Sequence, residues 1–510
     1  MGDSEGGQDG ASPDPALDLG FPVVDIAPDG DILLDVTFDT SKKTLKAATN
    51  SARPRPAQKT EPLVLKARTR VGYRVQLAVL KQNSRYFDNL LSDTRFAEAR
   101  SIEDALQRLS LQSVKPSEAK ASDLPVVKIH EDDEATQSAG QDAAFEDLMR
   151  ILHRKQSTAK PMSTQSLAVL AVLADRFACT ATISRYLAAL KYKWPATQTL
   201  LREDGRALSR AAEETLRQKI LVFWLLDQPL KMQAATRELI MYGSRRWSAS
   251  FDGADESKNN NMTAAWWDLP DGLETELHYR RECIFRTIAS IQRHFLSLYT
   301  SRTRQCKLGY ESSASCDSYQ LGEMVKFLTS RGLLFLTDFS SSSSSSDSHP
   351  RSVNASHDFA TTDIGHVLAT LKQVPAYQVD KHHTNCGLRT RVLPVLEFVQ
   401  AMLAAGVVAV SRQAWIKDRE ATSWVYEAEA GECEREQGNR NEEARKVFRF
   451  TRGMATDQRL RYEGTLAVDR MARALFTASE WDWTAEEKED VRGVEFGRWP
   501  IMSSSNGLIY

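Results

Sequence analysis

Three apolar segments near the start of the chain have the pattern of β-strands. Ile32–Phe38 is mostly apolar and partly β-branched, and the turn residues Pro28-Asp29-Gly30 precede it. Leu63–Thr69 and Val126–Ile129 have a similar character. Since each segment is short and lies among stretches of helical periodicity, the pattern predicts a few strands within a mixed α+β region.

Helical periodicity governs most of the remaining chain. Leu80 and Phe87 lie on two short predicted helices, and Ser84 is the expected N-cap of the second. From Phe145 to Leu152, apolar residues recur at intervals of three and four, which is one face of a helix. Further helices are predicted from about Ser163 and over Thr182–Tyr192, Leu216–Leu226, Leu230–Tyr242, Leu273–Tyr299, Ile364–Leu371 and Thr390–Val410.

The alternation of patterned and unpatterned segments predicts six regions. The first twenty residues are rich in Gly, Asp, Ser and Pro, and a later segment is an unbroken run of serine, so neither can bury enough apolar area to fold. The regions are a disordered acidic tail at 1–20, an α/β domain at 21–193, a helical region at 194–339, a serine-rich linker at 340–358, a second helical stretch at 359–426 and a charged segment at 427–510. Long insertions are predicted within the α/β domain at about 39–62 and 99–122, and the second of them is polar and of low order.

The overall charge is nearly balanced, with 66 Lys and Arg against 68 Asp and Glu and a net charge of −2. This balance excludes a polycation that coats nucleic acid and also a polyanionic disordered chain. Basic residues are concentrated between Asp39 and Arg74, where ten Lys and Arg stand against two acidic residues. We expect that segment to be a solvated loop able to contact acidic partners, and we expect no direct binding of nucleic acid.

The N-terminal residues and the cysteine content predict an intracellular protein, in the cytoplasm or the nucleus, with no membrane partner. Residues 1–20 carry five acidic residues and no Lys or Arg, the opposite of a secretory signal. The most apolar stretch, Leu393–Val410, is interrupted by Pro394, Glu397 and Gln400 and is too short and polar to cross a bilayer. Six cysteines in 510 residues are too few for a disulfide scaffold, which fits a reducing compartment.

Four pieces of the N-terminal part, taken in order, resemble a BTB/POZ domain. Pro28–Val36 is similar to the opening strand of that family, and Leu80–Ala99 is similar to its first helices. Phe145–His153 and Leu170–Cys179 resemble two of its later helices. The resemblance implies that the three predicted strands share one small sheet packed against these helices, so the fold class is α+β with a mostly α-helical region behind it.

A BTB/POZ domain works by presenting apolar helical surface and a sheet edge to a protein partner. The resemblance therefore implies an interaction protein that self-associates, serves as a transcriptional co-factor, or acts as a substrate adaptor for a cullin-type ubiquitin ligase. In the adaptor version, the expected contact surface lies around Phe145 and Met149 and the preceding loop with Asp132, Asp133 and Glu134. The later helical region resembles that of large BTB-containing proteins of filamentous fungi, which adds no function.

Three cysteines and a histidine pair in the helical region form a candidate metal site. Cys306 and Cys316, separated by nine residues, precede His382, His383 and Cys386. Three thiolates and one imidazole, from His383 or His382, would complete a closed Cys₃His set for structural zinc. The spacings do not match those of zinc fingers, so unligated thiols beside a surface histidine pair are the alternative.

The chain lacks the sequence motifs of phosphate-binding loops, dinucleotide folds, nucleophile elbows and metal-hydrolase helices. A catalytic Cys–His pair would need a third orienting group and an oxyanion element, and the sequence identifies neither. We therefore expect a non-catalytic protein with no cofactor beyond the candidate zinc. The alternative is a zinc-dependent or enzymatic function carried by the helical region.

Overall fold

The computed structural model describes residues 20–51, 66–157, 162–194, 208–248, 264–306, 308, 311–338, 359–383, 386–426 and 465–478. The chain divides into two compact units. The first unit comprises Met1–Arg281, Asp358–Asp363 and Ala409–Glu427, and the second comprises Glu282–His357, Ile364–Val408 and Ala428–Tyr510. The predictions for the acidic tail before Gly20, for the serine-rich linker and for most of the charged C-terminal segment fall outside the described residues.

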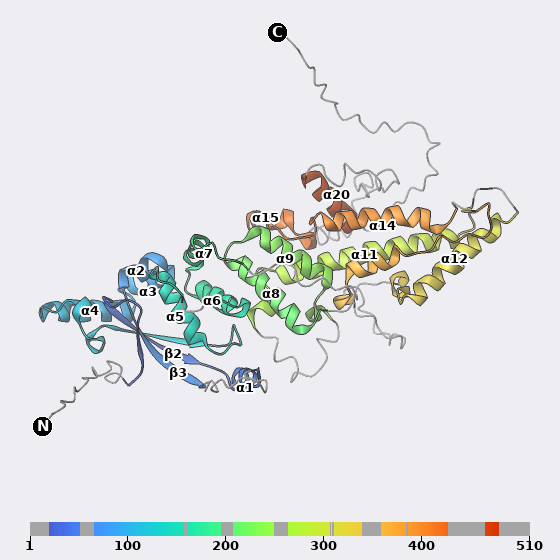
Figure 1. The fold of residues 1–510 in the computed structure, drawn as a ribbon. Helices are drawn as coiled ribbons and strands as arrows, with labels where there is room; N and C mark the ends of the chain where they lie inside the picture. The colour runs from blue at the N-terminus through green and yellow to red at the C-terminus, as the bar shows by residue number, and fades with distance from the viewer. Residues whose placement is uncertain are drawn as a thin grey trace, which may run out of the picture. The chain divides into compact units, whose positions relative to one another are not determined.

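The first unit contains a small sheet and the helices around it (Figure 1). Its strands are β1 (Val23–Asp25), β2 (Ile32–Asp39), β3 (Arg68–Val75) and β4 (Val126–Asp132), in the sheet order β1-β3-β2-β4. Its helices are α1 (Lys42–Ser51), α2 (Leu77–Asn83), α3 (Arg85–Ser92), α4 (Ala97–Leu111), α5 (Gln141–Leu152), α6 (Thr164–Arg176), α7 (Thr180–Ala189), α8 (Arg210–Leu225), α9 (Pro229–Tyr242), α15 (Arg412–Lys417) and α16 (Arg419–Thr422), with 3₁₀ turns η2 (Pro116–Glu118), η3 (Ala121–Asp123), η4 (Arg245–Trp247), η5 (Ala265–Trp267) and η8 (Phe359–Thr361). The prediction of an α+β chain, with a small sheet followed by a mostly helical region, is confirmed.

One face of the sheet carries an aromatic core. Phe145 of α5 lies 5.7 Å from the ring of Phe38 on β2 and 5.2 Å from that of Tyr73 on β3, measured between ring centroids. Phe177, the residue that ends α6, contacts Phe145 at 5.5 Å and stacks on Phe87 of α3 at 5.3 Å. The sheet and the helices α3, α5 and α6 therefore share one core, as the sequence analysis expects of these segments.

Ser84 caps helix α3, as the sequence predicts. Its Oγ accepts the backbone N–H of Phe87 at 3.1 Å and donates to the carbonyl oxygen of Phe177 at 2.7 Å. Because the hydroxyl is buried, it satisfies two backbone groups that would otherwise lose a hydrogen bond. The cap thereby joins the start of α3 to the end of α6.

The other face of the sheet is covered by a segment that the sequence analysis predicted to be a polar insertion of low order, residues 99–122. That prediction is wrong, because most of α4 and the turns η2 and η3 lie there. Leu109 and Leu124 pack with Ala119 against Leu33 of β2. The buried positions of α4 recur every three or four residues, but charged neighbours conceal this narrow stripe in the sequence.

The second predicted strand is misplaced by several residues. The prediction was Leu63–Thr69, whereas β3 starts at Arg68 and ends at Val75, and residues 61–65 lie outside the described residues. Register explains the shift, since Ile32 pairs with Val75 and each following residue of β2 pairs antiparallel with β3. Strand β4 pairs parallel with the other edge of β2. The predicted insertion at 39–62 begins with α1, and its later part is not among the described residues.

Helices α9 and α11 (Leu273–Thr300) are linked within the first unit through Arg281. This guanidinium is 2% exposed and donates to the carbonyl oxygens of Ile240 and Met241 at the C-terminal end of α9. It also donates to the carbonyl of Phe359 in η8 at 2.6 Å. A buried cation is thus satisfied by carbonyl groups at a helix terminus, where the helix dipole favours positive charge.

Gly243, the residue that ends α9, is expected to be irreplaceable by alanine. Its φ of 82° and ψ of −176° belong to a region that essentially only glycine adopts. A Cβ there would overlap the Ala360 carbonyl oxygen and lie 2.8 Å from the guanidinium carbon of Arg281. We expect Gly243→Ala to lower the free energy of unfolding by about 2–3 kcal/mol, measured by urea denaturation.

The matched control for this substitution is Gly140→Ala. Gly140 precedes α5 in a left-handed conformation with φ of 81°, but no atom lies within 4 Å of an added Cβ. Alanine there would lose only the ease with which glycine adopts a left-handed conformation, so we expect the free energy of unfolding to fall by about 1 kcal/mol. Equal losses in the two variants would show that the crowding around Gly243 has no energetic weight.

The second unit is built from helices. Besides the later turns of α11, it contains α12 (Ser313–Ser330), η6 (Leu334–Asp338), α13 (Ile364–Leu371), α14 (Leu388–Ala404) and α20 (Thr465–Thr477). Helix α14 ends before the predicted Val410, because Gly406 adopts φ of 78° two residues after its last turn and reverses the chain. Among the described residues, no helix is both long enough and apolar enough to span a bilayer.

Candidate metal centre

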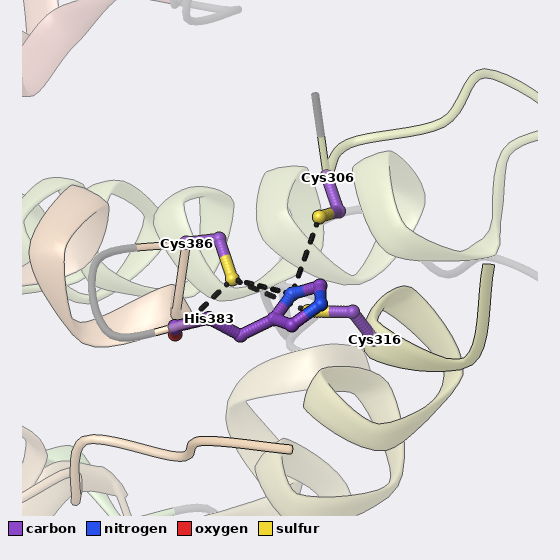
Figure 2. Close-up of side chains that lie close together, drawn as sticks. All are labelled: Cys306, Cys316, His383 and Cys386. Atoms are coloured by element: carbon purple, nitrogen blue, oxygen red, sulfur yellow. Dashed lines mark hydrogen bonds between the residues drawn. The ribbon is translucent and has the colours of Figure 1, made fainter. Parts of the chain in front are cut away.

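Four side chains that the sequence analysis grouped together meet at one point in the second unit (Figure 2). The donor atoms of Cys306, Cys316, His383 and Cys386 all lie within 4.8 Å of one another. The Nδ1 of His383 is 3.2 Å from the sulfur of Cys386 and 3.4 Å from that of Cys306, and the sulfurs of Cys316 and Cys386 are 3.3 Å apart. Of the two candidate histidines, His383 is fully buried and supplies the donor, whereas His382 is exposed.

The four donors come from three separate segments of the chain. Cys316 lies in the first turns of α12, Cys306 follows the end of α11, and Cys386 directly precedes Gly387, the N-cap of α14. Gln320 of α12, which is fully buried, holds the start of α14 by accepting the backbone N–H of Leu388 at 3.0 Å. The cluster therefore stands where the beginnings of two helices and a connecting segment meet.

A carboxylate fixes the segment that carries Cys306. Asp317, next to Cys316 on α12, accepts the backbone N–H of Cys306 at 2.9 Å and that of Gln305 at 2.7 Å. Each oxygen of the carboxylate takes one of these hydrogen bonds. Because Asp317 neighbours one cysteine and binds the backbone of the other, it holds the two thiols at a fixed separation.

The hydrogen bonds of His383 indicate which of its two ring nitrogens carries the proton. Ser312 Oγ donates to Asp380 Oδ2 at 3.2 Å and lies 2.9 Å from His383 Nε2. The serine has one proton, and it is directed at the carboxylate, so Nε2 must be the donor toward Ser312. In a neutral imidazole this leaves the lone pair on Nδ1, the nitrogen that points at the cysteines (Figure 2). Histidine ligands of zinc are oriented by hydrogen bonds of this kind.

The charge of Asp380 supports this arrangement. The backbone N–H of His382 donates to Asp380 Oδ1 at 2.8 Å. This hydrogen bond, helped by that of Ser312, holds the pKa of Asp380 below its usual range. The carboxylate is therefore ionised at neutral pH and acts only as an acceptor, which keeps the Ser312 proton directed toward it.

The donor set suits zinc in number, type and spacing. Tetrahedral zinc with sulfur ligands at about 2.3 Å would hold its donors about 4 Å apart, so movements of about 1 Å complete the tetrahedron. Burial raises the pKa of the Cys316 and Cys386 thiols, so both stay protonated until a cation displaces the protons. All four positions would be occupied by protein atoms, which is the arrangement of structural rather than catalytic zinc sites.

Replacing Ser312 by alanine is expected to weaken zinc binding by about 10–100-fold, because the ring of His383 loses the hydrogen bond that selects its tautomer. Competition with a chromophoric chelator measures this affinity. Ser318→Ala is the control. Ser318 is an exposed residue of α12, the helix that Ser312 precedes, and it is not part of the cluster. An unchanged affinity in the Ser312 variant would mean that the relay to Asp380 does not orient the imidazole.

The residues expected to contact a cullin are mostly inside the fold. Phe145 and Met149 are fully buried on α5, and Asp133, 5% exposed, accepts hydrogen bonds from Ser41. They are core residues and cannot form a docking surface, because the amphipathic face that the sequence displays is the face that packs on the sheet. Of the acidic loop, Asp132 is partly exposed and lies 3.6 Å from Arg176, and Glu134 is exposed.

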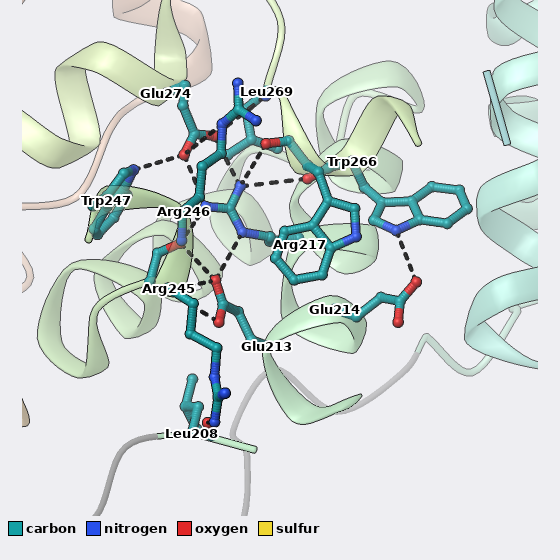
Figure 3. A network of polar contacts seen from close by, with 12 residues as sticks. Leu208, Glu213, Glu214, Arg217, Arg245, Arg246, Trp247, Trp266, Leu269 and Glu274 are labelled. Carbon is teal, nitrogen blue, oxygen red and sulfur yellow. Dashed lines mark hydrogen bonds and ion pairs between the residues drawn. The ribbon is translucent and has the colours of Figure 1, made fainter. Parts of the chain in front are cut away.

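A second cluster of buried polar groups lies in the first unit (Figure 3). Arg217 of α8, which is fully buried, binds both carboxylate oxygens of Glu274 at 2.8 Å and lies 3.2 Å from Glu213. Burial alone would raise the pKa of Glu274, but the charge and hydrogen bonds of Arg217 outweigh it and hold this pKa below its ordinary value. The buried ring of Trp267 stacks near this guanidinium, 5.2 Å from its carbon, so the cluster belongs to the core.

The orienting residues of the metal centre were not anticipated from the sequence. Asp317 and Asp380 each stand within three positions of a predicted ligand, which is a usable signal for a supporting carboxylate. Ser312 carries no such signal, because serine is common and its role depends on where α12 begins. The same holds for Arg217, whose helix looks amphipathic while its charge is buried.

Comparison with family models, with curated proteins and with solved structures found no match to this chain. The resemblance of residues 21–193 to a BTB/POZ domain therefore stays a prediction from the sequence. The evidence for the metal centre is its geometry, namely the four converging donors and the hydrogen bonds that orient them.

Proposed function

We propose that the second unit binds one structural zinc ion through Cys306, Cys316, His383 and Cys386. The observation that carries this proposal is the meeting of four zinc-type donors, from segments far apart in sequence, within 4.8 Å of one another. Three of the four residues are buried, and burying polar groups costs free energy that must be offset by favourable contacts. A bound cation would offset this cost by coordinating the thiols and the imidazole. The ion would link the start of α12 to the start of α14.

Metal analysis of the purified full chain tests the zinc proposal. We expect about one zinc ion per chain, and less than about 0.1 would contradict it. Replacement of zinc by cobalt gives an independent readout, because a tetrahedral site with three thiolates produces sulfur-to-cobalt charge-transfer absorption and strong visible bands. Their absence in a protein that holds cobalt would place the metal elsewhere.

For the whole chain, we infer a non-catalytic interaction protein that acts through the α/β region at residues 21–193. The support is the placement of the resembling segments: β2, β3 and β4 lie in one sheet, and α3, α5 and α6 share its core. The closed donor set also supports a structural rather than catalytic role for the metal. Self-association or a cullin-type partner is what the BTB/POZ resemblance implies.

Affinity purification with mass spectrometry tests the interaction proposal, together with light scattering for self-association. For the cullin version the informative substitution is Glu134→Lys, because this residue is exposed while Phe145 and Met149 are buried. Loss of cullin recovery in this variant, but not in Glu103→Lys on the exposed side of α4, supports the adaptor function. Absence of any cullin with the unaltered protein excludes it and leaves self-association or another partner.

A further inference from the structure

We propose that Cys316 and Cys386 form an oxidation site for hydroperoxides, at which disulfide formation expels the zinc ion. The inference rests on the zinc centre proposed above and adds a means of regulating it. Two observations point to this pair. Their sulfurs are in direct contact at 3.3 Å, and Cys386 is half-buried whereas Cys306 and Cys316 are 2% and 0% exposed.

The exposure of the three cysteine residues indicates which sulfur reacts first. A hydroperoxide must reach the sulfur that it oxidises, and Cys386 is the ligand with access to solvent. Bound to zinc, this sulfur is a thiolate, which is the nucleophilic form of cysteine. Cys316 lies behind it in the first turns of α12, in position to attack the oxidised sulfur.

The reaction proceeds in two steps, each of which balances. The Cys386 thiolate attacks one oxygen of hydrogen peroxide, so that an S–O bond forms, the O–O bond breaks and hydroxide leaves. The Cys316 thiolate then attacks the sulfur of this sulfenic acid, so that the S–S bond forms, the S–O bond breaks and a second hydroxide leaves. The two sulfurs together lose two electrons, the peroxide gains two, and two protons from the buffer convert both hydroxides to water.

Loss of the metal follows from loss of its ligands. A disulfide is not a thiolate, so the ion would retain only Cys306 and His383. A disulfide bond of about 2.05 Å requires the two sulfurs to approach by little more than about 1 Å from their present separation. In the oxidised cluster a covalent bond replaces the metal ion between α12 and the start of α14, while Cys306 and His383 are no longer joined to this pair by a metal ion.

The test treats the zinc-loaded full chain with hydrogen peroxide and follows two quantities. Zinc release is recorded with a chromophoric chelator, and disulfides are mapped by differential alkylation and mass spectrometry. We expect zinc to leave in step with a Cys316–Cys386 disulfide, while the buried Cys179 of the first unit stays reduced. Restoration of zinc binding by a dithiol reductant is expected, because sulfenic acid and disulfide are the reversible oxidation states.

A ligand swap isolates the role of Cys386. Cys386→His keeps four zinc donors but removes the accessible thiol, so peroxide-driven zinc release should slow by about tenfold. If this variant fails to hold zinc, the disulfide map of the unaltered protein still decides. Zinc-loaded protein that forms a different disulfide, or keeps its zinc under peroxide, overturns the oxidation site alone. A chain that purifies without zinc overturns the proposed metal centre and this inference with it.

Discussion

Replacing Cys316 by serine is expected to abolish zinc binding and to cause the largest loss of stability in the second unit. Cys316 is fully buried and supplies one of four ligands, and a serine hydroxyl does not replace a thiolate at zinc. Structural zinc contributes about 10–16 kcal/mol of apparent binding energy in small zinc domains, and much of it is folding energy. We expect the free energy of unfolding to fall by about 4 kcal/mol or more.

Thermal and urea denaturation with and without a chelator measure this effect. The unaltered protein should be destabilised by the chelator, whereas Cys316→Ser should already be destabilised and insensitive to it. Cys179→Ser is the matched control: this cysteine is also buried, but it lies in the first unit at the N-cap of α7, where serine is favoured. If the chelator leaves the unaltered protein unchanged, the ion does not support the fold.

Replacing Arg217 by methionine is expected to destabilise the first unit by about 4 kcal/mol. The substitution removes the cation and leaves the carboxylates of Glu213 and Glu274 buried, with side chains 1% and 12% exposed. Breaking a buried ion pair costs about 3–5 kcal/mol, because the remaining charge is uncompensated. Urea denaturation followed by tryptophan fluorescence reports the unfolding, and Trp247, whose indole N–H donates to Glu274 at 2.6 Å, is one of the ten tryptophans that contribute.

Two further variants separate buried charge from loss of a surface pair. Lys115→Met removes a pair with Glu118, whose side chain is 66% exposed, and should cost no more than about 1 kcal/mol. Adding Glu213→Gln and Glu274→Gln to the Arg217 variant neutralises the stranded carboxylates and should recover part of the lost stability. A triple variant as unstable as the single one would assign the loss to packing rather than to charge.

The elements with strong local signals were predictable from the sequence. The mostly apolar strand β2 buries residues on both faces of the sheet, and the serine caps at Ser84 and Ser163 begin helices as expected. Pro229 occupies the first turn of α9, where proline is tolerated, so the break before it was also predictable. These features depend on neighbours within a few residues, and the sequence contains that information directly.

The misplaced elements depend on partners distant in sequence. Val71, Tyr73 and Val75 bury one side of β3 only because β2 pairs with them in a fixed register. Helix α4 was missed because its narrow apolar stripe becomes significant only against Leu33 of the sheet. Phe145 and Met149 were misjudged for the same reason, since periodicity identifies an apolar face but not what covers it.

The sequence alone determined the pattern of strands and helices. It also supplied three thiols and a histidine of the types that bind zinc. Only the tertiary structure decided that these donors meet, that His383 rather than His382 is among them, and that Ser312, Asp317 and Asp380 orient them. The physical reason is that ligand type is a local property of a side chain. Convergence of donors from three segments within a few ångströms is instead set by how the helices that carry them pack together.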